Sequence, residues 1–130
     1  EIPYVATASV ADVRDLERKV TKAMSLSGAR YIHILVPCPL GWGAAPQDTI
    51  RLARLATESG LFAVFEAEYG EVTGRRKIRR KVPVEEYLKP QKRFAHLFRP
   101  VLQTEVIAGL QAIADKNIRR FGLHGEEAGA

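Results

Sequence analysis

The chain has 130 residues, 46% of them apolar and 27% charged, and carries a net charge of +5 at neutral pH. This length suits one domain with a core of its own, and no apolar run reaches the roughly 20 residues that a membrane span requires. A single cysteine excludes an internal disulfide and indicates a reducing, cytoplasmic setting. The excess of basic residues is compatible with an acidic partner.

The first half of the sequence predicts alternating strands and helices. Residues 3–8 are apolar and β-prone, which indicates a strand very close to the first residue. The next helix should carry an apolar stripe formed by Val13, Leu16, Val20 and Met24. Residues 30–37 are almost continuously apolar, and a strand of this kind is usually covered on both faces, as in a parallel sheet. Strand, helix and strand in this order predict a βαβ unit with a right-handed crossover.

The second half is less regular. A helix between Pro46 and Gly60 leads to a third strand over residues 61–70. Residues 71–81, EVTGRRKIRRK, indicate a turn and an exposed strand that form a basic hairpin, and prolines punctuate the connection after it. A long helix should run over residues 101–121. Its apolar face should be formed by Val106, Leu110, Ile113, Asn117 and Phe121.

These elements predict an α/β chain with a mostly parallel sheet, flanking helices, a basic β-hairpin and a long C-terminal helix. We divide it into a βαβ-type core at residues 1–70, the hairpin and proline-punctuated connection at residues 71–100, and the C-terminal helix with a loose tail at residues 101–130. The three segments together should form one domain. Because a strand begins almost directly after Glu1, we expect the chain to be a fragment of a longer one.

The stretch LVPCPLGWG holds the only cysteine, Cys38, just after the second predicted strand. In open α/β sheets, ligands gather at the carboxyl ends of strands. Pro37 and Pro39 stiffen this loop, and Trp42 can shield a site from water. Three interpretations of Cys38 stay open: a small buried apolar residue, a nucleophile activated by His33, and a metal or cluster ligand whose co-ligands lie elsewhere.

Four segments carry a resemblance: IPYVATAS, YIHILVPCPLGW, TIRLARLATESGLFAVFEAEYGE and PVEEYLKPQKRFAHLF. Together they resemble the C-terminal part of the β subunit of pyruvate:ferredoxin oxidoreductase (pyruvate synthase) and of related 2-oxoacid:ferredoxin oxidoreductases. The similarity runs from about residue 2 to residue 98 and continues more loosely along the last helix. The PCPLGW loop and the PVEEYLKPQKRFAHL segment are its most specific parts.

The resemblance implies a thiamine diphosphate-binding fold and the oxidative decarboxylation of pyruvate or a related 2-oxoacid to an acyl-CoA. Electrons would pass through a 4Fe-4S cluster to ferredoxin, and Cys38 would be the fourth cluster ligand. The complete subunit would hold thiamine diphosphate with Mg²⁺ and the cluster, and would act with its other subunits, ferredoxin, coenzyme A and the 2-oxoacid. The family's CxxC, third cysteine and GDG motif are missing from this sequence, so the chain alone should bind neither cofactor and be inactive.

A second class of function is a non-catalytic α/β binding module whose basic face contacts an acidic partner or nucleic acid. The stretch GRRKIRRK is the most basic part of the chain. It has no interleaved aromatic residue, so nucleic acid is not expected, and a hairpin edge protected by charge is a simpler interpretation. Glu66 and Glu68 share one strand face, which indicates a solvent-exposed end and not acid–base chemistry. Tyr87 and Leu88 should anchor the connection.

Overall fold

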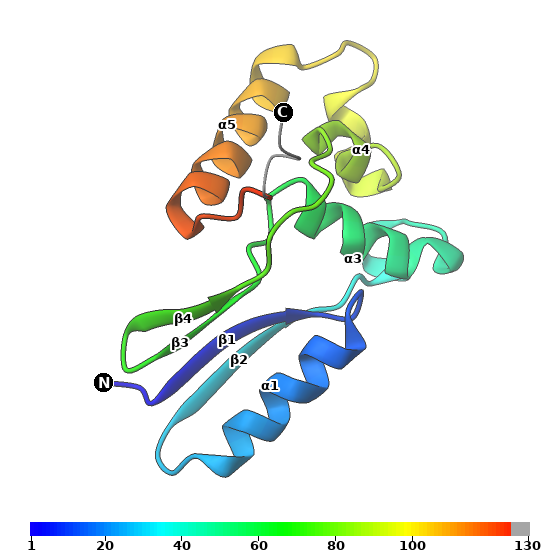
Figure 1. The fold of residues 1–130 in the computed structure, drawn as a ribbon. Helices are drawn as coiled ribbons and strands as arrows, with labels where there is room; N and C mark the ends of the chain where they lie inside the picture. Colours follow the sequence, from blue (N-terminus) through cyan, green and yellow to red (C-terminus); the bar gives the residue numbers. More distant parts are fainter. Residues whose placement is uncertain (126–130) are drawn as a thin grey trace.

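The computed structural model describes residues 1–125. The strands are β1 (Tyr4–Ser9), β2 (Arg30–Leu35), β3 (Phe65–Glu68) and β4 (Glu71–Arg75). The α-helices are α1 (Val13–Ser25), α2 (Pro39–Trp42), α3 (Thr49–Glu58), α4 (Val84–Leu88) and α5 (Thr104–Phe121), and the 3-10 helices are η1 (Pro46–Asp48) and η2 (Lys92–Leu97). Figure 1 shows the sheet and α1 at one end of the molecule and α3, α4 and α5 at the other.

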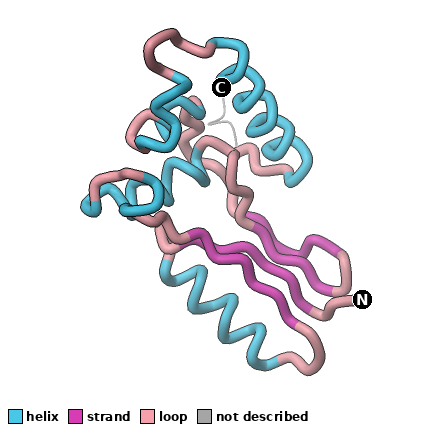
Figure 2. Tube along the Cα trace, turned by 180° about the vertical axis from the view of Figure 1, so that it is seen from behind, coloured by secondary structure: helices cyan, strands magenta, loops and turns pink. Residues whose placement is uncertain are grey.

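The four strands form one sheet in the order β2-β1-β3-β4 (Figure 2). β1 and β2 pair in parallel, which confirms the two parallel strands of the predicted βαβ unit. β3 pairs antiparallel with both β1 and β4, so the prediction of a mostly parallel sheet is wrong. The reason is the position of α3, which lies beyond the carboxyl end of β1 and not on a face of the sheet (Figure 1). The chain therefore re-enters the sheet from that end and runs back along β1.

β3 and β4 form the predicted hairpin, joined by the two-residue turn Tyr69-Gly70. Both turn residues have positive φ angles, 48° and 85°, which match a type I′ turn. β4 ends at Arg75, so most of the basic stretch has left the sheet and does not form a strand. Ile78 pairs instead with His124 in an isolated bridge, so the expected loose tail does not begin before residue 125. Residues 126–130 lie outside the described residues.

Two apolar clusters hold the described residues together. The smaller lies between α1 and the sheet and contains Tyr4, Ala6 and Ala23. The larger lies among α3, α4, η2 and α5 and contains Leu52, Leu55, Ala56, Val82, Val84, Tyr87, Leu88, Leu97, Ile107 and Ala114. The predicted anchoring of the connection by Tyr87 and Leu88 is therefore confirmed. Within residues 1–125, every helix is too short or too polar to cross a lipid bilayer.

The apolar stripes predicted for two helices face these clusters only in part. On α1, Val13 and Met24 are 65% and 78% exposed, while Lys19 and Ala23 are buried. On α5, the predicted residues Val106 and Ile113 are exposed. The buried residues of α5 lie one position further along: Ile107, Ala114 and Ile118. Leu16 and Leu110 are half-buried, and Leu110 packs against the larger cluster. The predicted stripes therefore lie only partly on the surface of the described chain.

The strand expected to be covered on both faces lies at an edge of the sheet. β2 pairs with β1 on one side only within the described residues, and most of its residues are exposed. Tyr31 is 57% and Ile34 is 40% exposed, on opposite faces of the strand. The sequence of β2 is therefore as apolar as that of a buried strand, but within the described residues the strand is largely exposed.

Replacing Gly60 with alanine is expected to destabilise the fold strongly. Gly60 follows α3 with a φ of 85°, and a Cβ there would lie 2.6 Å from Cγ1 of Ile118. The left-handed conformation costs about 1–2 kcal/mol for alanine, and the overlap with α5 adds about 1–3 kcal/mol. Urea unfolding followed by circular dichroism measures the loss.

Gly70→Ala is the matched control for Gly60→Ala. Gly70 has the same φ of 85°, but a Cβ there meets nothing within 4 Å. This control should lose only the conformational part, about 1–2 kcal/mol. Equal losses for the two variants would contradict a steric contribution from α5.

Candidate functional site

The Cys38 loop joins the end of β2 to α2. Cys38 is the N-cap residue of α2, and its Sγ accepts a hydrogen bond from the Gly41 amide at 3.4 Å. The thiol is exposed, so the interpretation of Cys38 as a buried apolar residue is wrong. Within the described residues, no hydrogen bond joins Cys38 to His33, whose ring packs edge-on against Phe62 at 5.4 Å. Among residues 1–125, the nucleophile interpretation therefore lacks the hydrogen bond from sulfur to His33 that it requires.

Arg93 connects this loop to the distant η2 segment. Its guanidinium lies 3.9 Å from the centre of the Trp42 ring, in the geometry of a cation–π contact. The same group donates to Gln91 Oε1 at 2.8 Å and to the Tyr87 hydroxyl at 3.1 Å. Because Gln91 and Tyr87 are buried, they hold the guanidinium in place. Trp42 is thus positioned by Arg93, which lies in the segment PVEEYLKPQKRFAHL and to which the sequence alone assigns no role.

The backbones of the two segments also touch. The Lys92 amide donates to the Gly43 carbonyl at 3.2 Å. A Cβ at Gly43 would lie 2.6 Å from the Cβ of Lys92, and the φ of Gly43 is 62°. Glycine is therefore required here for both conformation and space. The Cys38 loop rests on a rigid support made by the connection.

A second polar group joins α1 to β3. Glu66 is only 7% exposed and accepts a hydrogen bond from the Tyr4 hydroxyl at 2.7 Å. Arg18 pairs with it at 2.9 Å and Lys22 at 3.6 Å. Lys22 also pairs with Glu68 at 2.6 Å. The prediction that Glu66 lies at a solvent-exposed end is wrong, because α1 covers that face of the strand.

The charges in this group shift each other's protonation. Burial alone would raise the pKa of Glu66, but the hydrogen bonds from Arg18 and Tyr4 outweigh it and hold the pKa below its ordinary value. Burial, followed by the bond to Glu66, raises the pKa of Tyr4. The bond to Glu68 raises the pKa of Lys22. A carboxylate held ionised in this way fastens α1 to the sheet and is poorly suited to accept protons.

The described residues can supply part of a metal site but not a whole one. Within residues 1–125, no group of three His, Cys, Asp or Glu side chains could hold a metal ion. Cys38 is an exposed free thiol on a supported loop, and a thiolate is a soft ligand suited to iron. Within residues 1–125, Cys38 is therefore an accessible single donor and not part of a complete metal site.

No family model matches the chain. Among curated proteins, a pyruvate synthase subunit PorB from Methanosarcina barkeri is 50% identical over 121 residues, which cover 93% of this chain and 41% of the relative. The chain is similar to pyruvate synthase subunit PorB. The PorB of Methanocaldococcus jannaschii is 43% identical over 122 residues, 94% of this chain and 39% of the relative. A ketoisovalerate oxidoreductase subunit VorB from Pyrococcus furiosus is 39% identical over 105 residues, 79% of this chain and 34% of the relative.

The resemblance to PorB predicted from four segments is therefore confirmed. A match over 93% of the chain includes both the Cys38 loop and the connection that supports it. The names of these relatives denote subunits of oxidoreductase enzymes. The chain spans about two fifths of the length of the PorB relatives, and it matches their C-terminal part.

Replacing Glu66 with glutamine is expected to lower the free energy of unfolding at neutral pH by about 1–3 kcal/mol, because the buried Tyr4 hydroxyl and the partly exposed Arg18 lose a charged acceptor. Since the pKa of Glu66 in the fold lies below its ordinary value of 4.5, the ionised carboxylate stabilises the fold above that pH. This contribution disappears as the pH falls through the lowered pKa. Wild type and variant should thus converge in stability in acid, as measured by urea unfolding from neutral pH to about pH 3.

Glu68→Gln is the matched control on the same strand. Its side chain is 32% exposed and pairs with Lys22 near the surface, so it should lose at most about 1 kcal/mol. A stability difference for Glu66→Gln that stays constant from neutral to acid pH would contradict the proposed role of its charge.

Proposed function

We propose that the chain is the C-terminal part of the catalytic β subunit of a 2-oxoacid:ferredoxin oxidoreductase. The complete enzyme would convert a 2-oxoacid, coenzyme A and two oxidised ferredoxins into an acyl-CoA, carbon dioxide, two protons and two reduced ferredoxins. The observation that carries this proposal is the 50% identity to a PorB over almost the whole chain. Pyruvate is the first substrate to test, since the relatives with 50% and 43% identity are named pyruvate synthase subunits.

Cys38 is proposed as one of four thiolate ligands of a 4Fe-4S cluster, with the other three supplied from outside this chain. The structure supports this role through the exposed sulfur and the rigid support behind its loop. The Gly41 amide already donates to the sulfur at 3.4 Å, and hydrogen bonds of this kind tune the potential of a cluster. When bound, thiamine diphosphate with Mg²⁺ supplies carbanion stabilisation and the cluster supplies one-electron transfer.

The remaining residues of the chain would position this ligand. Pro37 and Pro39 limit the backbone on both sides of Cys38. Trp42, held by Arg93, would keep water from one side of the loop. Within the subunit, residues 1–70 would carry the loop, residues 71–100 would support it, and residues 101–130 would complete the domain. The setting would be the cytoplasm, with the other subunits and ferredoxin as partners.

The test uses the complete subunit that contains this sequence, assembled with its partner subunits under anaerobic conditions. Ferredoxin reduction should require both coenzyme A and a 2-oxoacid, with pyruvate compared against 3-methyl-2-oxobutanoate. Higher kcat/KM with pyruvate would assign the enzyme to the pyruvate synthases. A correctly assembled complex that reduces ferredoxin with no 2-oxoacid would refute the proposal.

A further inference from the structure

A cleft with a volume of about 650 Å³ lies outside the carboxyl end of β1. One wall is the first half of α1, the second is the last half of α3, and the third is the segment 74–79 that leaves β4. In open α/β sheets, this end of a strand is where ligands bind. The volume lies within the range of about 300–1,000 Å³ that is typical of small-molecule sites.

The basic wall of this cleft is fixed at its backbone. The Arg76 amide donates to the Val64 carbonyl at 2.9 Å, and the Ile78 amide donates to the Leu123 carbonyl at 2.8 Å. The segment is therefore tied to the start of β3 on one side and to the end of α5 on the other. It is not the solvated strand edge that the sequence suggested, because β4 has already ended at Arg75.

Positive charge exceeds negative charge along the cleft. Its basic residues are Arg18, Lys19, Arg54, Arg75, Arg76, Lys77 and Arg79, and its acidic residues are Asp12, Asp15, Glu58 and Glu66. Three of the four carboxylates are already paired with a lining cation: Asp12, Asp15 and Glu66. Of the ion pairs within residues 1–125, none uses Arg54, Arg75 or Arg79. With respect to the described carboxylates, these guanidinium groups are available to bind an anion.

We propose that this cleft binds a small molecule through its phosphate groups. Guanidinium groups bind phosphate oxygens in a bidentate manner. Arg54 and Arg79 contribute such groups from two different walls of the cleft. A concave site of this volume favours a small ligand, whereas an acidic protein surface would need a broader, flatter contact. The inference goes beyond the proposed function and does not depend on it, because it rests only on the shape and charge of this cleft.

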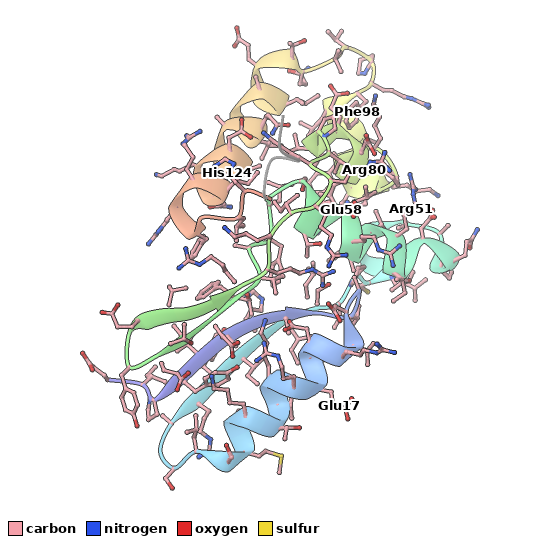
Figure 3. All side chains as sticks on the ribbon, viewed as in Figure 1. Glu17, Arg51, Glu58, Arg80, Phe98 and His124 are labelled. Carbon is pink, nitrogen blue, oxygen red and sulfur yellow. The ribbon has the colours of Figure 1, made fainter. Side chains whose placement is uncertain are left out.

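The experiment compares two double variants that change the net charge equally. Arg54→Glu with Arg79→Glu reverses charge inside the cleft. Arg51→Glu with Arg80→Glu reverses charge on the same helix and directly after the segment 74–79, at residues that do not line the cleft. Figure 3 labels Arg51 and Arg80 at these two positions. Titration calorimetry measures the binding of inorganic pyrophosphate, ADP and coenzyme A to the full 130-residue chain, and circular dichroism checks that each variant is folded.

We expect saturable binding of at least one of these probes. Its Kd should rise about tenfold or more in the cleft variant and stay near the wild-type value in the control. Tighter binding of ADP or coenzyme A than of pyrophosphate would show that the cleft also contacts the organic part of the ligand. If charge reversal unfolds the chain, Arg54→Gln with Arg79→Gln should still weaken binding about threefold or more.

Three results would overturn the inference. The first is that none of the probes binds saturably to the wild-type chain. The second is an equal loss of binding in the cleft and control variants, which would reveal non-specific attraction to the basic surface. The third is binding of a polyglutamate peptide without binding of any phosphate probe, which would assign the cleft to an acidic polypeptide.

Discussion

Replacing Cys38 with serine in the complete subunit is expected to deplete the proposed 4Fe-4S cluster while thiamine diphosphate binding is largely retained. Serine keeps the shape of the side chain, but its oxygen is a poor ligand for iron that prefers soft sulfur. Ferredoxin reduction should therefore fall by about 10–100-fold or more. Iron analysis and the paramagnetic spectrum of the reduced enzyme measure the loss of the cluster directly.

Leu40→Ser in the same loop is the control for this result. Leu40 is 96% exposed and carries no thiol, so the iron content should stay at the wild-type value. If Cys38 is not a ligand, Cys38→Ser at its exposed position should change stability by no more than about 0.5 kcal/mol. A full complement of iron with an unchanged spectrum in the Cys38 variant would exclude it from the cluster.

The isolated chain is expected to associate with itself through β2. The outer edge of this strand has no neighbour within the described residues, and unprotected apolar edges pair with other strands. Replacing Tyr31 and Ile34 together with lysine should keep the chain monomeric, since both side chains are exposed at that edge. Sedimentation velocity over a range of concentrations distinguishes the two states.

Leu102→Lys serves as the control for this prediction, because Leu102 is 52% exposed but lies far along the chain, just before α5. It should leave the association of the wild-type chain unchanged. In the complete subunit, the lysine pair at Tyr31 and Ile34 should instead impair assembly. A wild-type chain that sediments as a monomer at every concentration would contradict the prediction that this edge pairs with another strand.

The sequence predicted the strands and long helices well, but not the direction of the third strand. Apolar periodicity locates β3 without encoding which way it runs. The direction of β3 depends on where α3 lies relative to the sheet. That position is set by the packing of α3 against α4 and α5. One local signal was available: Tyr69-Gly70 between two short strands fits a tight hairpin turn. The apolar patterns of α1, β2 and α5 predicted burial for all three elements. Such a pattern does not show which other element would cover it.

For the candidate site too, some residues could be predicted from the sequence and others could not. Cys38 stood out in the sequence because it is a lone thiol between two prolines, and the structure places it in the open. The role of Arg93 could not be predicted, because its contact with Trp42 joins residues more than fifty positions apart. Glu66 was misjudged because alternation along a strand gives the face of a residue but not the helix that covers that face.

The contacts of Gly43 with Lys92 and of Trp42 with Arg93 bear on how such subunits can be recombined. The two segments that carry the most specific resemblance pack against each other and form one structural unit. A chimera could import the loop at residues 36–43 from a VorB-type relative and keep the connection at residues 83–98. The imported loop would then pack against a connection whose side chains match a different loop. Exchanging both segments together preserves the contacts between them. The segments to exchange are therefore chosen by their contacts in the fold and not by their proximity in the sequence.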